Sequence, residues 1–332
     1  MQTPEFWFRP PGWQSALLAP VAAVVGAVAG RRFARPPLYR APVPVLCVGN
    51  PTVGGAGKTP TVQLLIRIVR ELGRRPMVLS RGHGGRLTGP VVVDPARHTA
   101  ADVGDEPLLL SADAPVVISR DRPAGARLAV AQGAELILMD DGFQNPGLYK
   151  DLSLLVLDAR RGIGNGRVLP AGPLRLALAP QLARAGALMV IGEGTGADPV
   201  VLAAAARGLP VHHGWLEPAA DFTGVRALAF SGIGDPAKFH RSLGEAGAEI
   251  VGRRSFADHH PFSEAEAAAL LAEAEALGAV PVTTEKDRAR LIGAEGEARR
   301  ALLARLRTLP VRLRPAEPET LRLRLAALFG RA

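Results

Sequence analysis

The chain has 332 residues and is 48% hydrophobic, so it can form one large or two medium-sized domains with a substantial core, and it is not a disordered protein. The net charge is +9. The 40 basic residues are 36 arginines and four lysines, and they are scattered along the chain. Because no basic run is interleaved with aromatic residues, we expect no nucleic-acid partner. The single cysteine, Cys47, lies in an apolar strand pattern and is expected to be a buried, reduced thiol.

Residues 1–35 hold an apolar helix pattern. No charged residue occurs from Pro10 to Gly30; aromatic residues gather at the start of this stretch (Phe6, Trp7, Phe8 and Trp13) and arginines follow it (Arg31, Arg32 and Arg35). This arrangement is typical of a helix at a bilayer interface, and it differs from a signal peptide, which carries its positive charge in front. We expect residues 6–30 to associate with a membrane, by spanning it or by lying in its interface; if the helix spans, the arginines place the rest of the chain on the cytoplasmic side. The alternative is an Ala-rich helix packed on the protein.

After residue 36, short apolar runs alternate with helical patterns, which is typical of βαβ units and a parallel sheet. The first series predicts strands at 43–48, 76–80, 115–118, 135–139, 152–157 and 187–191, with helices near 60–72, 103–111 and 121–132. The second predicts strands near 225–230, 248–251, 279–283 and 310–313, with helices near 236–246, 263–276, 296–307 and 317–329.

Residues 207–224, between the two series, are rich in Gly and Pro, so we predict a linker there, with a hairpin as an alternative. The predicted fold class is α/β, with two P-loop- or Rossmann-like domains of mainly parallel sheet. A nucleotide-binding domain is expected at 36–206 and a smaller C-terminal domain at 225–332, in addition to the N-terminal helix at 1–35.

The stretch "VLCVGNPTVGGAGKTPTVQLLIRIV", residues 45–69, runs from a predicted strand through a glycine-rich loop into an amphipathic helix. Such a loop can turn backbone N–H groups around phosphates, with a Lys for the outer phosphates and a Ser/Thr hydroxyl for magnesium. The strict pattern needs a Gly where this chain has Thr52, but the physical requirements are met. The predicted nucleotide-binding residues are Gly54, Gly55, Ala56, Gly57, Lys58 and Thr59. The alternative is a glycine-rich turn with an incidental Lys.

Carboxylates follow two predicted buried strands. "AELILMDDGFQ" ends in Asp140 and Asp141, and "LSLLVLDA" ends near Asp158. Aspartates at strand ends are common turn residues, but a magnesium nucleotide site also needs a carboxylate at the end of a buried strand. Together with the phosphate loop, they predict a magnesium site that uses Thr59, Asp140 and Asp141.

Two further groups of polar residues stand out. Asp105 and Glu106 in "DVGDEPLLL" lie at a predicted helix start, where a favourable interaction with the helix dipole is one explanation. "FADHHPF" places Asp258, His259 and His260 after a strand, a composition that a metal site could use. No further ligand lies at suitable spacing, so catalysis or capping is favoured over metal binding.

Several motifs, in order, resemble the tetraacyldisaccharide 4'-kinase family of lipid A biosynthesis. They are "VGNPTVGGAGKTP", "SRGHGG", "GDEPLLL", "DDGFQNPGLYKDLSLLVLDARRGIGNGRVLPAGPLR", "FSGIGDPAKF", "FADHH" and "TTEKD", over residues 43–290. The long central motif is far more specific than a phosphate loop. The resemblance implies transfer of the γ-phosphate of ATP, with Mg²⁺, to the 4'-hydroxyl of a tetraacyldisaccharide 1-phosphate lipid at the cytoplasmic face of the inner membrane.

The resemblance also implies roles for individual residues. Asp105 would be the base for the sugar hydroxyl, with His259 as its partner, and Lys58 would act on the transferring phosphate. Asp140 and Asp141 would lie near the metal. The remaining implied phosphate or lipid contacts are Arg81, Gln144, Asn165 and Arg175.

The chain departs from the family pattern at Asn145, where a His is usual, at His83, where an aromatic is usual, and at Leu176, where an acidic residue is usual. None of these positions lies in the phosphate loop or the acidic pair. The rival hypothesis is a membrane-anchored P-loop switch or assembly ATPase, for which the long central motif has no explanation.

Overall fold

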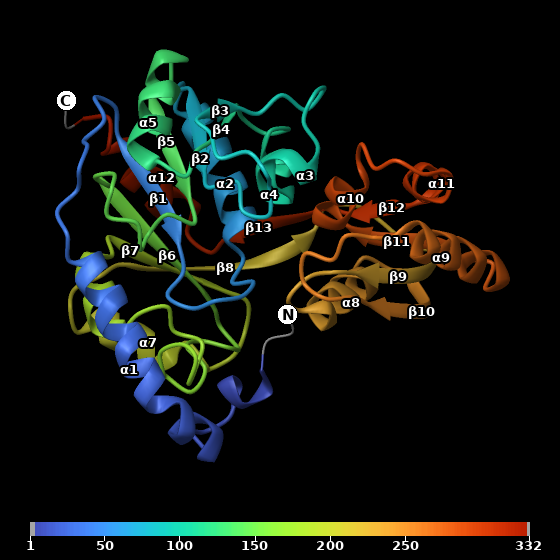
Figure 1. The fold of residues 1–332 in the computed structure, drawn as a ribbon, viewed down its shortest axis with the longest axis horizontal. Coiled ribbons are helices and arrows are strands. Elements are labelled where there is room, and N and C mark those ends of the chain that lie inside the picture. Colours follow the sequence, from blue (N-terminus) through green and yellow to red (C-terminus); the bar gives the residue numbers. More distant parts are fainter. Residues whose placement is uncertain (1–3, 331–332) are drawn as a thin grey trace.

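Residues 4–330 are described by the computed structural model, in which two α/β lobes of unequal size lie side by side and an apolar helix lies along the larger one (Figure 1). The larger lobe contains a nine-stranded sheet with the order β13-β8-β7-β6-β1-β5-β2-β4-β3. Its strands are β1 (Val45–Gly49), β2 (Pro76–Ser80), β3 (Val91–Val92), β4 (Val116–Ile118), β5 (Leu136–Asp140), β6 (Leu152–Asp158), β7 (Ala187–Ile191), β8 (Val211–Pro218) and β13 (Val311–Pro315).

Neighbouring strands of this sheet are parallel except at the edges, where β3 and β13 run antiparallel to β4 and β8. Every residue of β1, β2, β5 and β7 is buried, because helices cover both faces. Strands buried on both faces read as continuous apolar runs, which is why the sequence predicts them well. Cys47 is fully buried in β1, as predicted, and burial raises the pKa of its thiol to about 11.

The helices of the larger lobe are α2 (Lys58–Glu71), α3 (Ala100–Val103), α4 (Asp105–Leu110), α5 (Arg122–Ala131), α6 (Leu178–Arg184), α7 (Asp198–Ala205) and α12 (Pro318–Ala326). On one face of the sheet, α2, α4 and α12 contribute Leu65, Leu108 and Leu325 to a single core. On the other face, α5, α6 and α7 contribute Ala126, Leu182 and Val200 to a second core. The α2 side chains have the spacing that predicted an amphipathic helix.

The smaller lobe has a four-stranded parallel sheet with the order β10-β9-β11-β12. Its strands are β9 (Arg226–Ser231), β10 (Glu249–Ser255), β11 (Val280–Thr284) and β12 (Arg307–Leu309), and its helices are α8 (Pro236–Glu245), α9 (Glu264–Ala276), α10 (Glu285–Leu291) and α11 (Glu297–Arg305). Phe239 of α8 packs on one face of this sheet, and Leu270 and Leu302 of α9 and α11 pack on the other. The α/β fold class with mainly parallel sheets is confirmed.

Two predicted boundaries were wrong. Residues 207–224 are not a free linker, because they contain β8, which pairs with β7 in the large sheet. Residues 311–315 and 318–326, assigned to the second domain, return to the larger lobe as β13 and α12. In β13, Leu313 is buried while Arg312 and Arg314 are exposed, the alternation of an edge strand, which does not specify the sheet it joins. The predicted helix at 103–111 is also interrupted, at Gly104, whose φ is 91°.

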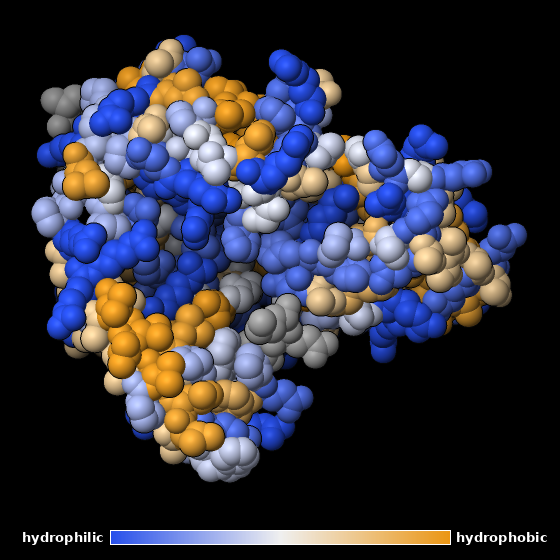
Figure 2. Space-filling view, viewed as in Figure 1, coloured by the Kyte–Doolittle hydropathy of each residue, from blue (hydrophilic) through white to orange (hydrophobic). Residues whose placement is uncertain are grey.

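The predicted N-terminal helix is confirmed as α1 (Trp13–Phe33), preceded by a 3-10 turn, η1 (Glu5–Phe8). One side of α1 contacts the protein: Ser15 Oγ donates a hydrogen bond of 2.6 Å to the carbonyl of Ala171, and Phe33 is buried. The other side exposes Trp13, Leu17, Val21, Val24 and Val28. Figure 2 shows apolar residues gathered over this part of the surface.

Candidate active site

The loop between β1 and α2 has the conformation of a phosphate cradle. Gly54 and Gly57 have φ values of 108° and 94°, which favour glycine. A Cβ added at Gly54 or Gly55 would meet no atom within 4 Å, so open space lies beside the loop. The first turn of α2 leaves backbone N–H groups free for a ligand. Buried Asn50 supports the loop, since its amide donates to the Gly54 carbonyl at 3.4 Å and its Oδ1 accepts from Lys58 Nζ at 3.1 Å.

Asp140 and Asp141 lie at the end of β5, beside β1 and its loop. Asp141 has a φ of 46°, and its Oδ2 is 3.0 Å from Arg175 Nη2 and 3.8 Å from Lys58 Nζ. Burial, together with the charges of Glu106 and Asp141, raises the pKa of Asp140 to about 7. Burial also opposes ionisation of Asp141, but Lys58 and Arg175 lower its pKa below the ordinary value. A residue with positive φ and a carboxyl with a strongly shifted pKa are both typical of functional sites.

The acidic pair has the donor atoms that a divalent cation requires. Oδ1 of Asp140 and Oδ1 of Asp141 are buried and have no hydrogen-bond partner among the described residues. No group of three or more His, Cys, Asp or Glu side chains forms a metal cage within residues 4–330. Mg²⁺ with a nucleotide is usually held by one or two carboxylates, waters and phosphates, so two unpartnered carboxylate oxygens beside a phosphate loop fit this ion.

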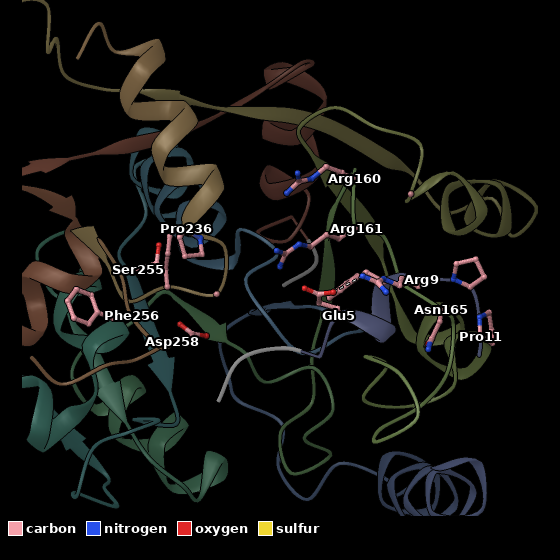
Figure 3. A pocket seen from close by; sticks show the side chains of 16 residues that line it. Glu5, Arg9, Pro11, Arg160, Arg161, Asn165, Pro236, Ser255, Phe256 and Asp258 are labelled. Carbon is pink, nitrogen blue, oxygen red and sulfur yellow. Dashed lines mark hydrogen bonds and ion pairs between the residues drawn. The ribbon is translucent and has the colours of Figure 1, made fainter. Parts of the chain in front are cut away.

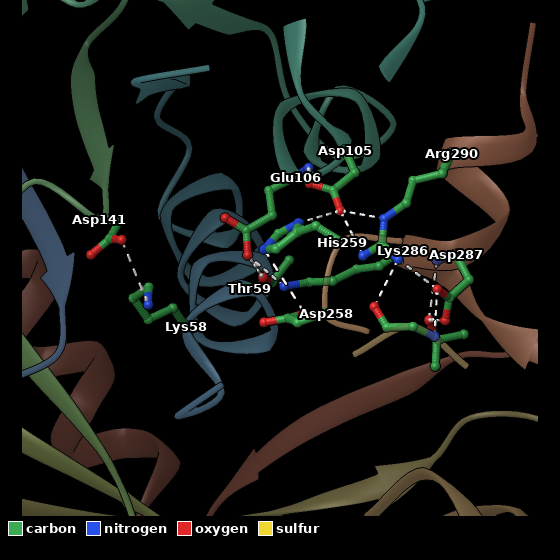
Figure 4. Close-up of polar contacts among 12 residues, drawn as sticks. Lys58, Thr59, Asp105, Glu106, Asp141, Asp258, His259, Lys286, Asp287 and Arg290 are labelled. Carbon is green, nitrogen blue, oxygen red and sulfur yellow. Dashed lines mark hydrogen bonds and ion pairs between the residues drawn. The ribbon is translucent and has the colours of Figure 1, made fainter. Parts of the chain in front are cut away.

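Glu106 connects the phosphate loop to the smaller lobe. Its Oε1 accepts from Thr59 Oγ1 at 3.3 Å and also from Lys286 Nζ of α10 (Figure 4). Burial opposes its ionisation, but the charges of Lys286 and Lys58 lower the pKa of Glu106. No role beyond the helix dipole was predicted for Glu106, and none was predicted for Lys286.

Asp105, at the start of α4, meets His259 from the smaller lobe. Asp105 Oδ2 is 2.9 Å from His259 Nδ1 and 2.8 Å from Arg290 Nε, and Arg290 in turn contacts Asp287 at 2.6 Å (Figure 4). Burial favours the neutral acid, yet the hydrogen bond from His259 and the charge of Arg290 hold the pKa of Asp105 well below its usual range. The hydrogen bond to Asp105 raises the pKa of His259. Asp105 is therefore an ionised, oriented carboxylate.

Arg290 is a site residue that the sequence reasoning missed. It lies on α10, one helical turn after Lys286, so both side chains reach α4. The adjacent "TTEKD" motif and this spacing were the available signal, but only the docking of the lobes shows that these cations meet Asp105 and Glu106.

A cleft of about 1060 Å³ opens between the two lobes and the N-terminal segment (Figure 3). Its walls include Arg9, Arg160, Arg161, Ser255 and Asp258. At one end, Asp258 Oδ1 is 3.9 Å from His259 Nε2. The cleft therefore extends from Asp258, the neighbour of His259, to the residues that precede α1.

The model of the family described as LpxK, tetraacyldisaccharide-1-P 4'-kinase, matches residues 14–329. The chain belongs to this family. It is 57% identical over 297 residues to the tetraacyldisaccharide 4'-kinase of Bradyrhizobium sp. strain BTAi1, covering 88% of this chain and 86% of the relative. It is 52% identical to that of Methylorubrum extorquens over the full length of both. The crystal structure of LpxK from Aquifex aeolicus in complex with ATP has a TM-score of 0.72 and 26% identity, covering 95% of this chain and 99% of that one.

These findings confirm the prediction of a lipid A 4'-kinase of α/β fold and do not favour the switch ATPase. The metal-cluster alternative at residues 258–260 also finds no support. His260 has other partners: its Nε2 lies 2.9 Å from Glu266 Oε1, and its ring stacks on Phe256 with centroids 4.9 Å apart.

Some residues implied by membership of the LpxK family have protein partners in this structure. The amide of Gln144 donates to the Asn50 carbonyl at 2.9 Å and to Gln181 Oε1 at 3.0 Å, so it braces the phosphate loop. The amide of Asn165 donates to Ser15 Oγ at 2.8 Å and so ties α1 to the body. The contacts of Gln144 and Asn165 with phosphate or lipid stay predictions, and Asn165 also lines the cleft. Arg81 is exposed directly after β2.

The three departures from the usual LpxK pattern have local structural settings. The ring of His83 lies edge-on to that of His259, with centroids 5.8 Å apart, so this position does border the site. Asn145 Oδ1 accepts from the backbone of Gly147 at 2.8 Å in a turn, and Leu176 is buried.

Proposed function

We propose that this LpxK family member transfers the γ-phosphate of ATP to the 4'-hydroxyl of a tetraacyldisaccharide 1-phosphate, at the site formed by the phosphate loop and the Asp105–His259 pair. The observation that supports this most strongly is the 2.9 Å contact between Asp105 and His259, next to the Glu106–Thr59 link to the loop. It supports the proposal because an ionised carboxylate close to a phosphate-binding loop is what transfer to a hydroxyl requires.

The nucleotide would be held by the loop backbone at Gly54, Gly55, Ala56 and Gly57. Lys58 Nζ, which lies between Asn50 and Asp141, is within reach of the outer phosphates and would neutralise charge that develops on the transferring group. Its contacts with Asn50 and Asp141 orient the ammonium group, which limits the reorganisation that the reaction requires.

Mg²⁺ would be held by the Thr59 hydroxyl and by the carboxylates of Asp140 and Asp141. When bound, it would supply charge neutralisation at the phosphates. The bond from Thr59 to Glu106 keeps the hydroxyl oriented, and Arg175 holds the carboxylate of Asp141.

Asp105 would accept a hydrogen bond from the 4'-hydroxyl and align its oxygen with the γ-phosphorus. As the new O–P bond forms and the bond to the ADP oxygen breaks, the hydroxyl proton passes to the Asp105 carboxylate. Because its pKa is far below neutrality, Asp105 is a weak base, so its main contribution is orientation, as suits a loose transition state. His259 and Arg290 hold the carboxylate in place.

We further propose that α1 lies in the cytoplasmic interface of the inner membrane instead of crossing it. Its length and apolar composition would permit a crossing. However, the side that carries Ser15 and Phe33 contacts the protein, while the opposite side exposes Leu17 and Val24. A helix that is apolar on its free side and attached on the other suits insertion parallel to the bilayer, with the arginines after it near anionic headgroups.

The test uses purified full-length protein, γ-labelled ATP, magnesium and tetraacyldisaccharide 1-phosphate in mixed micelles. A kinase transfers label to the lipid, in proportion to the ADP formed. Label recovered only as inorganic phosphate, independent of the lipid, would instead support the switch ATPase.

A further inference from the structure

The loop after β6 presents two adjacent arginines to the cleft. β6 ends at Asp158, whose Oδ1 accepts the backbone N–H groups of both Arg160 and Arg161 at 3.0 Å. The Asp158 carboxylate therefore fixes the turn from which both guanidinium groups extend. Both side chains line the cleft (Figure 3).

Both guanidinium groups converge on one carboxylate of the smaller lobe. Asp235 Oδ2 is 2.9 Å from Arg160 Nη2 and 3.1 Å from Arg161 Nη2. Asp235 is the N-cap of α8, and Lys238 of that helix reaches back to Asp158 at 3.3 Å. The five side chains comprise three cations and two carboxylates, so the group has a net charge of +1 and an additional anion would be favourable there.

The arginine pair lies along the path that an acceptor would take through the cleft. One end of the cleft is formed by Asp258, beside His259, and by Gly234. Gly234 lies close to the phosphate loop, because a Cβ added to it would be 3.8 Å from the backbone nitrogen of Gly55. The other end is at Arg9 and Pro11, directly before α1. A disaccharide whose hydroxyl is at the catalytic end would extend its second sugar toward the membrane segment, past Arg160 and Arg161.

We propose that Arg160 and Arg161 bind the phosphate monoester on the second sugar of the acceptor, and that Asp235 is the counter-ion that this phosphate displaces. The inference rests on the proposed function, in which the acceptor is a disaccharide 1-phosphate. Two guanidinium groups can form several charge-assisted hydrogen bonds to a dianion with three terminal oxygens, whereas a carboxylate has two oxygens and one charge. Before the acceptor binds, Asp235 keeps both arginines oriented. Its displacement also frees the start of α8 from the larger lobe.

The experiment compares two acceptors, tetraacyldisaccharide 1-phosphate and the same lipid without its 1-phosphate, with the full-length protein. The double variant Arg160→Gln/Arg161→Gln should raise KM for the phosphorylated acceptor by about 10- to 100-fold, the usual effect of losing charged hydrogen bonds. KM for the other acceptor and for ATP should change by less than about threefold. The matched control is Arg167→Gln, an exposed arginine of the same loop outside the cleft lining, which should behave as the wild type.

Asp235→Asn tests the counter-ion. Asn is also a good N-cap, so α8 is preserved, and we expect a several-fold lower KM for the phosphorylated acceptor alone. If the double Gln variant does not fold, Arg160→Lys/Arg161→Lys replaces it, with a smaller rise in the same KM. Three results would overturn the proposal. In the double variant, KM could rise equally for both acceptors, or it could rise for ATP alone. The wild-type protein could also fail to distinguish the two acceptors. Phosphorylation of the lipid that lacks the 1-phosphate shows separately that the kinase activity is intact.

Discussion

Replacing Asp105 by Asn removes one negative charge from the site while preserving the size of the side chain. Asp105 is only 5% exposed, and its Oδ2 contacts His259 at 2.9 Å and Arg290 at 2.8 Å. Arg290 would keep its 2.6 Å contact with Asp287, so the substitution does not leave a buried cation unpaired. We therefore expect Asp105→Asn to lower the free energy of unfolding by about 1–3 kcal/mol, with the fold retained.

The effect on turnover should be much larger than the effect on folding. A positioned group that accepts a proton contributes about 10²–10⁴ in rate, and the low pKa of Asp105 favours the lower end, about 100-fold. The apparent affinity for ATP should be nearly unchanged, because the phosphate loop is linked to Glu106 and not to Asp105. His259→Ala should also be impaired, and the double variant should be little worse than the poorer single variant, since the two residues act as a unit.

The assay is the initial rate of lipid phosphorylation against ATP concentration, at saturating acceptor and at two magnesium concentrations. The matched control is Asp102→Asn, which removes a neighbouring carboxylate that contacts Arg86 and Thr99 instead of the site, and which should retain turnover. Turnover of Asp105→Asn close to that of the wild type, at equal folded fraction, would refute the reasoning and leave Asp105 as a helix cap. Rescue by added magnesium would show that it is a metal ligand.

Lys58→Ala should lower turnover by about 100-fold or more, because a preorganised charge contact to the transferring phosphate is lost; near-normal turnover of the folded variant would contradict the phosphate-loop assignment. The triple variant Leu17→Ser/Val21→Ser/Val24→Ser changes only the exposed side of α1. Its sedimentation with anionic vesicles should fall, while phosphorylation of micellar lipid persists. Unchanged sedimentation would place the membrane contact elsewhere. The pKa of His259 is raised in the folded protein, so the stability that it contributes is complete below its unfolded value of about 6.5 and is lost as the pH rises through the higher folded value. The deficit of His259→Asn in thermal melts should therefore be greater at pH 6 than at pH 9, and a deficit that grows with pH would count against the Asp105–His259 hydrogen bond.

The sequence predicts those parts of the site that depend on local patterns. The strand before the phosphate loop, the glycines of that loop and the carboxylates at the end of β5 are encoded in consecutive residues, and all lie where the pattern indicates. Gln144 and Asn165 were predicted as phosphate or lipid contacts, and the protein partners that the structure shows for them, Gln181 and Ser15, come from distant segments. A motif therefore shows that a side chain is constrained without showing what it contacts.

The contacts between the lobes could not be predicted in the same way. Lys286 and Asp235 lie in quoted motifs and Arg290 follows one, but no role was predicted for any of them. Their roles arise only when the smaller lobe docks on α4 and on the end of β6. The same limit explains β13 and α12: the periodicity of an element shows which of its faces is buried, but not which sheet buries it.

The most direct test of the central claim is the position of the transferred phosphate. The product formed from ATP and tetraacyldisaccharide 1-phosphate by the wild-type protein can be examined by phosphorus NMR and fragmentation mass spectrometry. We predict one new phosphate monoester, on the 4'-oxygen, and almost none with Asp105→Asn under the same conditions. A phosphate at another hydroxyl, or hydrolysis of ATP with the lipid unchanged, would contradict the account.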